Sequence, residues 1–536
     1  MSFLDITNLS VSINETQILR GVSLSISAGE IVAITGESGS GKSMTALATM
    51  GLLPKGSQTT GTITFEGQNL LARSEADLCS IRGNNIGMVF QEPMTALNPV
   101  QTIGAQVVET ILIHGTMSKS DAVVRAAEVL TRVGLPQNRF PLSRYPHELS
   151  GGQRQRVVIA MAIALRPKLL IADEPTTALD VTTQAQILNL LQNLARDYDM
   201  GLLIITHDLA VVADMADKTV VMQLGEVVEK DETKSLLRNM QHDYTKMLFA
   251  ASGHQVSLPD RPASDVLLSV KNVVRDYTTP RKTLFSSKGV FRALDAVSFD
   301  IKHGERLGLV GESGCGKSTL TRAILGLEDV QGGEITLDGA PVFTGSKPNL
   351  TVRRRMQVVF QDPFGSFNPR HKVARLIAEP FHLLETPPSN DDRQRLISET
   401  LTAVGLDPSD ADKYIHQFSG GQRQRIAIAR TLIIQPDLII FDEAVSALDV
   451  SVRAQILDLL ADLSAKYNLT YLFISHDLRV VRTITDRVLV MQRGKIVEQG
   501  ETKQVFTAPN HPYTQELIAA APVLPALQHL QGRATA

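Results

Sequence analysis

Two glycine-rich stretches of this 536-residue sequence end in a lysine and a serine. The first, GESGSGKS, runs from Gly36 to Ser43, and the second, GESGCGKS, runs from Gly311 to Ser318. Both match GxxxxGK[ST], a pattern whose backbone N–H groups cradle phosphates while the lysine meets the outer phosphates and the hydroxyl binds Mg2+. The residues predicted to bind nucleotide are Gly36, Ser38, Gly39, Gly41, Lys42 and Ser43, and in the second stretch Gly311, Ser313, Gly314, Gly316, Lys317 and Ser318.

Two apolar stretches end in a pair of carboxylates. LLIADE ends in Asp173 and Glu174, and LIIFDE ends in Asp442 and Glu443. At the end of a buried strand, the first carboxylate of each pair is placed to hold Mg2+ and the second to polarise an attacking water. These residue types in this order favour phosphoryl chemistry over a purely structural helix cap.

Two further apolar stretches, LLIITH and YLFISH, end in His207 and His476. The same spacing separates these histidines as separates Glu174 from Glu443. We therefore expect each histidine to contact the γ-phosphate from the side opposite the carboxylates.

A second type of anion cradle occurs in each half of the chain as SGGQRQR. A helix whose first turn is Ser-Gly-Gly offers N–H groups and a hydroxyl to an anion with little side-chain bulk. The arginines that follow are expected to form a solvated face. Because each half already has a phosphate loop, we predict that this cradle serves the nucleotide of the other half. Its residues are Ser150, Gly151, Gly152 and Gln153, and Ser419, Gly420, Gly421 and Gln422.

The motifs belong to a tandem repeat of one domain. The segments from Leu149 and from Phe418 align without a gap over the SGGQ, carboxylate and apolar stretches. In each copy, apolar strands alternate with helices, which predicts an α/β fold with a mainly parallel sheet, an antiparallel β subdomain at the start, and a helical subdomain over residues 101–142 and about 373–414. We predict domains at 1–251 and 266–536, joined by a linker at 252–265.

Composition excludes several classes of protein. The net charge is −3, with 53 basic and 56 acidic side chains, which argues against a broad surface for nucleic acid. Two cysteines are too few for a disulfide framework, a four-cysteine zinc site or a four-cysteine iron-sulfur cluster. No secretory signal is recognised, and no apolar stretch approaches the roughly 20 residues that span a bilayer. We expect a cytoplasmic protein that does not cross the membrane.

In motif order, both halves resemble the ATPase domains of ABC proteins. The motifs are Walker A (the glycine-rich stretches), the Q-loop glutamine (Gln91 and Gln361), the signature (SGGQ), Walker B (the stretches that end in Asp-Glu), the D-loop (TALD from Thr177 and SALD from Ser446) and the switch histidine (His207 and His476). The resemblance implies two ATP molecules sandwiched between domains that face head to tail. It further implies that Gln91 and Gln361 take part in catalysis and, with Ser43, Asp173, Ser318 and Asp442, hold Mg2+. Site one is then expected to comprise Lys42, Ser43, Gln91, Asp173, Glu174 and His207, closed by Ser419 and Gly421, and site two to comprise Lys317, Ser318, Gln361, Asp442, Glu443 and His476, closed by Ser150 and Gly152.

Other segments resemble one subfamily. FQEPMTALNP, FQDPFGSFNPR and the tails HDYTKMLFAA and HPYTQELIAAAP are similar to segments of oligopeptide, dipeptide and nickel importer ATPases. The arrangement in one chain is similar to the fused ATPases of microcin C and peptide uptake systems. This resemblance implies two permease subunits and a periplasmic solute-binding protein as partners, no nucleic acid, and a peripheral location on the cytoplasmic face of the bacterial inner membrane. The tails receive no chemical role from the sequence.

One departure from the family pattern concerns the residue expected to stack on adenine. Ile13 stands where an aromatic residue that stacks on adenine is expected, and Tyr277 is the counterpart expected in the second copy.

One alternative function stays open. The alternative is an ABC-type ribosome-associated translation factor, which also has two such domains and no membrane span. Its members carry a long charged helical arm between the domains, whereas this linker is short and contains proline.

Overall fold

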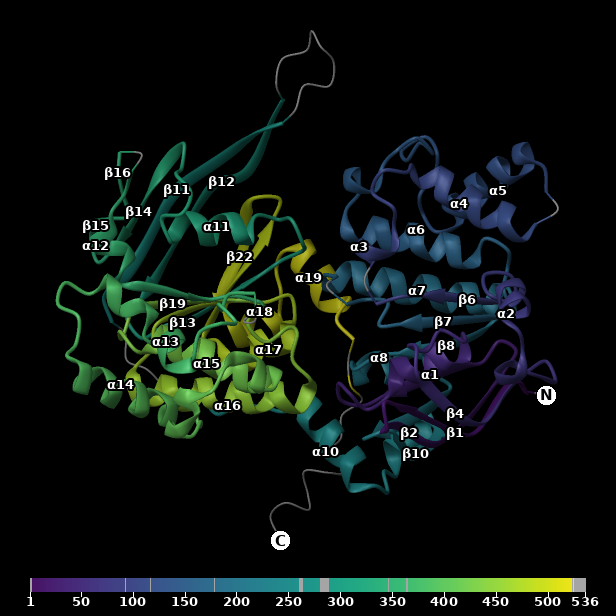
Figure 1. Ribbon diagram of the computed structural model, residues 1–536. Coiled ribbons are helices and arrows are strands. Elements are labelled where there is room, and N and C mark those ends of the chain that lie inside the picture. The colour runs from purple at the N-terminus through teal and green to yellow at the C-terminus, as the bar shows by residue number, and fades with distance from the viewer. Residues whose placement is uncertain are drawn as a thin grey trace.

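The structure is a computed structural model that describes residues 2–91, 93–115, 117–177, 179–259, 264–279, 289–345, 347–362, 365–522 and 524. The chain folds into two halves of the same architecture that lie next to each other (Figure 1). The first half ends with α10 at Ser252, and the second begins with β11 at Val266.

The first half contains two sheets. The antiparallel sheet has the strand order β2-β1-β4-β5. The other sheet has the order β10-β9-β3-β8-β7-β6, in which all strands except β10 run parallel. The strands are β1 (Ser2–Ile13), β2 (Thr16–Ser27), β3 (Ile31–Thr35), β4 (Ser57–Phe65), β5 (Gln68–Asn69), β6 (Ile86–Val89), β7 (Leu169–Asp173), β8 (Gly201–Ile205), β9 (Lys218–Gln223) and β10 (Glu226–Glu232).

Helices pack against the mainly parallel sheet of the first half. Among them, α4 and α5 form a further helical layer. The helices are α1 (Lys42–Thr49), α2 (Glu75–Ile81), α3 (Pro93–Ala96), α4 (Ile103–His114), α5 (Lys119–Arg132), α6 (Gly151–Ile163), α7 (Val181–Asp197), α8 (Leu209–Met215), α9 (Thr233–Arg238) and α10 (Asp243–Ser252). Thr102 and Ser118 cap α4 and α5 by accepting backbone N–H groups, as short polar side chains favour. Both helices fall in the stretch for which a helical subdomain is predicted.

The second half repeats this plan. Its antiparallel sheet has the order β12-β11-β14-β15, and its mainly parallel sheet the order β18-β19-β20-β13-β21-β22. The strands are β11 (Val266–Thr279), β12 (Gly289–Lys302), β13 (Arg306–Val310), β14 (Gly332–Leu337), β15 (Ala340–Pro341), β16 (Phe343–Thr344), β17 (Lys347–Pro348), β18 (Met356–Val359), β19 (Leu438–Asp442), β20 (Tyr471–Ile474), β21 (Arg487–Gln492) and β22 (Lys495–Glu501). The helices are α11 (Lys317–Ile324), α12 (Leu350–Arg353), α13 (Val373–Ile377), α14 (Asn390–Ala403), α15 (Gly420–Leu432), α16 (Val450–Tyr467), α17 (Leu478–Ile484), α18 (Thr502–Thr507) and α19 (Pro512–Ala519).

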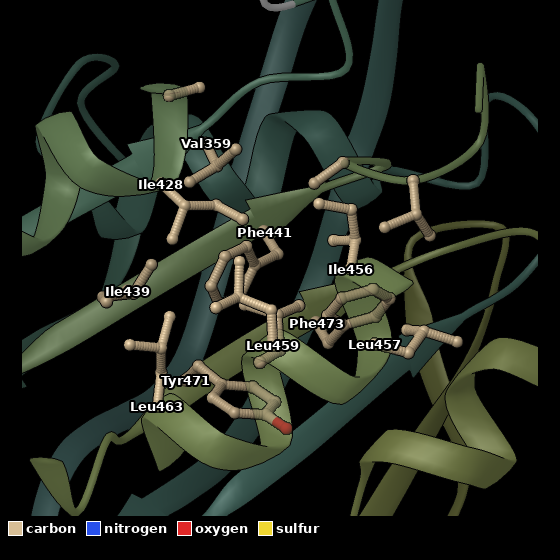
Figure 2. Packing of buried hydrophobic residues seen from close by; sticks show 14 of the residues in the cluster. Val359, Ile428, Ile439, Phe441, Ile456, Leu457, Leu459, Leu463, Tyr471 and Phe473 are labelled. Carbon is tan, nitrogen blue, oxygen red and sulfur yellow. The ribbon is translucent and has the colours of Figure 1, made fainter. Parts of the chain in front are cut away.

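Burial explains why the central strands read as apolar runs. Every residue of β3, β7 and β8 is buried, because one face of the sheet packs against helices and the other packs against α1 and the antiparallel sheet. In the second half, Phe441 on β19 packs edge to face on Tyr471 of β20, with ring centroids 5.5 Å apart, and Phe473 completes the aromatic group. Figure 2 shows these rings around the α16 residue Leu459, with Val359 above Phe441. The predicted fold class, two tandem α/β domains with antiparallel and helical subdomains, is confirmed.

The two halves touch through their last helices. α10, at the end of the first half, packs against α16 of the second, and α19 packs against α7 of the first (Figure 1). His254 and Asp458 form an ion pair across the same boundary, with Nε2 and Oδ1 2.7 Å apart. Among the described residues, no helix is long and apolar enough to cross a bilayer.

Candidate nucleotide-binding sites

Each phosphate loop lies between a buried strand and the first turn of a helix. β3 leads into the first loop, and α1 begins at Lys42; β13 and Lys317 of α11 repeat the arrangement. Gly36 has φ 150°, and a Cβ atom there would lie 2.2 Å from the carbonyl oxygen of Met222. Gly311 faces the carbonyl of Met491 at the same distance. Only glycine allows the loop to pass this close to the neighbouring strand, so the first glycine of each motif fixes the shape of the cradle.

The two loop lysines are buried inside their own loops. Lys42 Nζ donates to the carbonyl oxygens of Gly36 and Glu37, both at 2.8 Å. Lys317 repeats these contacts with Gly311 and Glu312 at 2.7 and 2.8 Å. Burial lowers the pKa of Lys42, while neighbouring carboxylates, first of all Glu174, oppose the shift. A desolvated ammonium group therefore lies ready at the centre of the cradle, where phosphate oxygens would replace the carbonyl contacts.

The first carboxylate of each acidic pair lies beside the phosphate loop. Ser43 Oγ donates to Asp173 Oδ1 at 3.1 Å, which joins the end of β7 to the start of α1. Burial raises the pKa of Asp173 and of Asp442, and the adjacent glutamate adds to the shift at both. A cation would offset this cost by favouring the ionised form. A hydroxyl and a carboxylate oxygen at this separation are hard oxygen donors, and they fit Mg2+.

The second carboxylate contacts the predicted histidine and, in the first half, the predicted glutamine. His207 Nδ1 lies 3.3 Å from Glu174 Oε1, and Gln91 Nε2 donates to Glu174 Oε2 at 3.0 Å. Burial alone would raise the pKa of Glu174, but the hydrogen bond and charge of His207, the Thr177 hydroxyl and Lys42 lower it to about 2. The structure thus brings together the first-half residues that the sequence assigns to hydrolysis.

The second half differs in one contact. His476 Nδ1 lies 3.3 Å from Glu443 Oε2, as in the first half. Gln361 Nε2, however, donates to the Ser446 hydroxyl at 3.4 Å, whereas Gln91 donates to the glutamate. Burial opposes ionisation of Glu443, and the nearby His476 outweighs it, so the pKa of Glu443 is lowered.

Both glutamates that the sequence predicts to be catalytic have left-handed backbone conformations. Glu174 has φ 45° and Glu443 has φ 52°. A residue other than glycine adopts such angles at a cost, and it keeps them where its surroundings hold it. Here the backbone N–H groups donate to Ile205 and Ile474, the last residues of β8 and β20, at 2.9 Å. The turn directs each glutamate side chain away from the strand end, toward the histidine.

The signature serines cap the helices that follow them. Ser150 accepts from the N–H of Gln153 at 3.3 Å, and Ser419 accepts from Gln422 at 3.4 Å, each within a capping box. In the part of the chain that the structure describes, neither serine hydrogen-bonds to a phosphate loop. The predicted closure of each site by the other half's serine therefore stays a prediction.

The two signature glycines have different reasons to be glycine. A Cβ at Gly152 would lie 2.2 Å from Thr183 Cγ2 on α7, so this glycine permits close packing of two helices. At Gly151 the nearest atom would be 3.6 Å away, and at Gly420 no atom lies within 4 Å. The first glycine of each signature is therefore not required by close packing of its own half.

The expectation that the signature arginines form a solvated face is wrong. Arg154 Nε donates to the carbonyl oxygen of Pro146 at 2.7 Å, and an Arg156 guanidinium N–H donates to that of Val133 at 2.7 Å. Burial lowers the pKa of Arg156. Val133 follows α5 in the helical subdomain, and Pro146 lies between that subdomain and the signature, so the two arginines tie the signature helix to the subdomain.

The aspartates that end the TALD segment (residues 177–180) and the SALD segment (residues 446–449) reach the phosphate loop of the opposite half. Asp449 Oδ1 accepts from the backbone N–H of Ser38 at 2.7 Å, and Asp180 Oδ2 accepts from that of Ser313 at 3.4 Å. Beside the second contact, the Thr182 hydroxyl donates to Glu312 at 2.8 Å. Both aspartates belong to the repeated D-loop motif, but no contact with the opposite half was predicted for them, and Thr182 was not predicted at all. They make the two loops reciprocal: each is contacted by the half that does not contain it.

The tails also reach the phosphate loops. Tyr244 of α10 accepts from the backbone N–H of Glu37 at 3.0 Å, and Tyr513 of α19 accepts from that of Glu312 at 3.0 Å. The histidine two residues earlier caps each tail helix, since Nδ1 of His242 or His511 accepts from the tyrosine N–H at 3.2 Å. The shared His-x-Tyr pattern is therefore a helix cap followed by a contact to the nucleotide cradle.

Ile13 and Tyr277 occupy equivalent positions. Each lies on the first strand of its half, five residues after an asparagine with left-handed backbone, Asn8 at φ 51° and Asn272 at φ 49°. The Arg275 guanidinium lies 4.9 Å from the centre of the Tyr277 ring. Stacking of this ring on adenine stays a prediction.

Comparison with known proteins places the chain in a family. The family model "ABC transporter" matches residues 19–177 and 294–446, and "Oligopeptide/dipeptide transporter, C-terminal region" matches residues 497–536. The chain is 44% identical over 561 residues to "Glutathione import ATP-binding protein GsiA" of Escherichia coli (strain K12), covering 97% of this chain and 89% of that protein. The protein of that name from Shigella flexneri is equally similar. Among solved structures, cbiO1 from Clostridium perfringens is 26% identical and covers 46% of this chain and 94% of its own, with a TM-score of 0.39.

Proposed function

Because this chain belongs to the ABC transporter family and is an ATPase coupled to import, we propose that it drives uptake of peptides or peptide-like solutes by closing its two halves on two ATP molecules. The observation that carries this proposal is the reciprocal contact of each phosphate loop with an aspartate of the other half, Asp449 with Ser38 and Asp180 with Ser313. One chain thus supplies both halves of a pair that must face head to tail.

Site one consists of first-half residues closed by the second half. Lys42 leaves its carbonyl contacts to bind the outer phosphates, and Ser43, Asp173 and Gln91 are the oxygen donors that would hold Mg2+. Bound Mg2+ neutralises charge on the phosphates as the bond to the γ-phosphate breaks. Site two uses Lys317, Ser318, Asp442 and Gln361 in the same roles.

Glu174 and Glu443 orient and activate the attacking water. The contact with His207 keeps Glu174 ionised, but a carboxylate with a pKa of about 2 is a weak base. When His207 turns from the glutamate to the γ-phosphate, the glutamate loses its strongest stabilising partner and its pKa rises. The histidine thereby links the presence of the γ-phosphate to the basicity of the glutamate that activates the attacking water.

Closure brings the signature cradles to the nucleotides. The N–H groups of Gly151 and Gly420, at exposed helix starts, and the hydroxyls of Ser150 and Ser419 would bind the γ-phosphate of the opposite site, and helix N-termini favour such anions. These contacts exist only in the closed state, so ATP shifts the population toward closure and hydrolysis reverses it. Tyr277 is proposed to stack on adenine in site two.

The partners follow from the family. We propose that the chain binds two permease subunits at the cytoplasmic face of the inner membrane and, through them, serves a periplasmic solute-binding protein. The relatives at 44% identity are named as glutathione importers, and the tail matches the oligopeptide and dipeptide transporters. A short peptide or a tripeptide such as glutathione is therefore the proposed solute class. The tail match favours an importer over a ribosome-associated factor.

The test is uptake by cells whose only copy of this chain carries defined substitutions. We expect Glu174→Gln and Glu443→Gln each to retain ATP binding and to slow hydrolysis at its own site about 100-fold or more, since a general base contributes 10²–10⁴. The variant with both changes should slow total hydrolysis and labelled peptide or glutathione uptake to the same extent. Arg482→Ala, on the exposed face of α17, is the control and should leave both rates unchanged. Undiminished uptake of every peptide in cells lacking the chain would contradict the proposal.

A further inference from the structure

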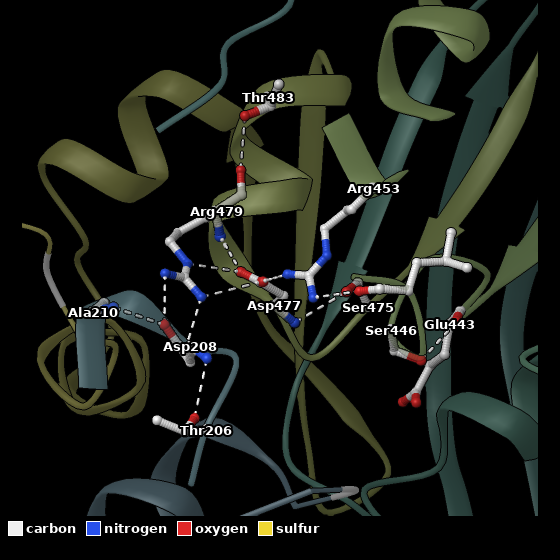
Figure 3. Close-up of polar contacts among 11 residues, drawn as sticks. Thr206, Asp208, Ala210, Glu443, Ser446, Arg453, Ser475, Asp477, Arg479 and Thr483 are labelled. Atoms are coloured by element: carbon white, nitrogen blue, oxygen red, sulfur yellow. Dashed lines mark hydrogen bonds and ion pairs between the residues drawn. The ribbon is translucent and has the colours of Figure 1, made fainter. Parts of the chain in front are cut away.

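A single arginine joins the two switch-histidine loops across the boundary between the halves. Asp208 and Asp477 directly follow the switch histidines and cap α8 and α17. Arg479 NH1 and NH2 donate to the carboxylate of Asp208 at 3.3 and 3.1 Å, and its Nε donates to Asp477 at 3.3 Å. Figure 3 shows the guanidinium between the two carboxylates. One side chain from the second half thus holds the loop of the first.

The bridge has no counterpart in the opposite direction. The residue of α8 that corresponds to Arg479 is Ala210. Asp477 has a second cation in its own half, because Arg453 NH1 lies 2.9 Å from it, whereas the corresponding residue of α7 is Gln184. Among the described residues, Arg479 is the one cation that pairs with Asp208. The first-half loop therefore depends on the second half for its counter-charge.

The network is shielded from solvent, which makes it worth more than a surface ion pair. The side chains of Asp208 and Asp477 are each 15% exposed, and that of Arg479 is 36% exposed. Burial alone would lower the pKa of Arg479, but the two carboxylates outweigh it and raise it. Removing one partner would leave a carboxylate largely desolvated and unpaired, a costly change. The shared guanidinium thus favours one separation of the two loops.

A cavity of about 190 Å3 lies around this bridge. Both switch histidines line it, together with Asp208, Asp477 and Arg479. The loops therefore border open space between the halves, into which either can shift. A shift of one loop changes the distance between the two carboxylates that share the guanidinium, so the free energy of moving one loop depends on the position of the other.

We propose that Arg479 is a positioning residue that couples the two switch loops, so that ATP bound at one site favours binding at the other. The proposal rests on the proposed function, in which each switch histidine turns to the γ-phosphate. Coupling between two sites is a free energy, and it appears as cooperative binding with a Hill coefficient between one and two, the number of sites.

The test is equilibrium binding of a nonhydrolysable ATP analogue with Mg2+ to the full-length chain, measured by calorimetry. We expect a Hill coefficient above one for the unaltered protein, falling to about one in Arg479→Ala, as independent sites require. Asp208→Asn should produce the same loss, since asparagine still caps α8 but carries no charge. The double variant should lose no more than either single variant, because both changes remove one interaction.

Controls separate coupling from simple damage. Arg482→Ala, also on α17 but exposed, should keep the cooperativity of the unaltered protein. A Hill coefficient of one in the unaltered protein, an unchanged value in Arg479→Ala, or a loss in Arg479→Ala that Asp208→Asn does not reproduce would each overturn the coupling. ATP hydrolysis by the same preparations tests the proposed function separately: hydrolysis with noncooperative binding removes only the coupling, and absence of both binding and hydrolysis removes both.

Discussion

Asp449 and Ser38 are hydrogen-bonded across the boundary between the halves, with the aspartate Oδ1 2.7 Å from the backbone nitrogen of the phosphate loop. The corresponding contact of Asp180 with Ser313 is longer, 3.4 Å. The same hydrogen bond therefore occurs twice between the halves, and the longer one is the weaker. Since the loop is the part of each site that binds phosphate, this contact transmits a change in one half directly to the nucleotide cradle of the other.

The unequal distances predict unequal effects of mutation. A hydrogen bond to a charged group contributes about 1.5–3 kcal/mol, so Asp449→Ala should raise the KM for ATP roughly tenfold or more. Asp180→Ala should have a smaller effect, because its contact is at the limit of hydrogen-bond length. Steady-state ATPase assays check this, with Asp458→Ala as a control that alters the boundary away from the loops. Equal effects of both loop aspartates would contradict the structural difference.

The proposed sandwich predicts that a substitution in one half impairs hydrolysis at the ATP site of the other half. Ser419→Arg places a bulky cation where the second half's signature is proposed to meet the nucleotide of Lys42, far away in sequence. We expect loss of hydrolysis at the Lys42 site, while the folded state survives because the serine lies at an exposed helix start. To isolate that site, the assay uses the Glu443→Gln background. Turnover that persists there despite Ser419→Arg would exclude a composite site.

The tails provide a third prediction. Tyr244→Phe and Tyr513→Phe each remove the acceptor for a backbone N–H of a phosphate loop and leave the packing of the ring intact. An intramolecular hydrogen bond contributes about 1 kcal/mol, so each variant should bind ATP roughly fivefold more weakly, as judged by the KM. Tyr467→Phe, at an exposed position, is the matched control. If the tyrosine variants match that control, the tails act in a way unrelated to the loops.

The sequence predicted the fold and the residues within each half because both depend on local signals. Glycine-rich loops, carboxylates after apolar strands and the alternation of strands with helices are all readable from neighbouring residues, and the repeat shows them twice. The contacts of Asp449 and Arg479 were not predicted, because they depend on how two distant segments meet. No spacing of residues in the sequence indicates that Asp208 forms an ion pair with a residue of the other half.

For the glycines and arginines of the signature, the structure adds a packing role that the motif alone does not indicate. Gly152 matches the signature pattern, yet its lack of a side chain is explained first by Thr183 on α7, which a Cβ would strike. The signature arginines look like a polar surface in the sequence, and the carbonyls that they bind become visible only when the helical subdomain is in place. Packing between elements, unlike the motif itself, leaves no periodic trace in the sequence.

The contact between His207 and Glu174 predicts a shift in pH dependence. The pKa of Glu174 is lowered from 4.5 to about 2, so in the folded protein this interaction contributes stability that is present above about pH 4.5 and is lost as the pH falls toward 2. His207→Ala removes the largest of the favourable contributions and leaves burial, which raises the pKa. The acid limb of the single-site kcat/KM profile, which reports the protein without bound ATP and is measured in the Glu443→Gln background, should therefore move to higher pH.

The same variant separates two roles of the histidine. If His207 also contacts the γ-phosphate, hydrolysis at the optimum pH falls as well as shifting, whereas a histidine that only sets the ionisation of Glu174 shifts the profile without lowering its maximum. His207→Gln, which keeps a hydrogen-bond donor but cannot be charged, is the matched control and should restore part of the maximum. An acid limb that stays in place in His207→Ala would show that the histidine does not determine the ionisation of Glu174.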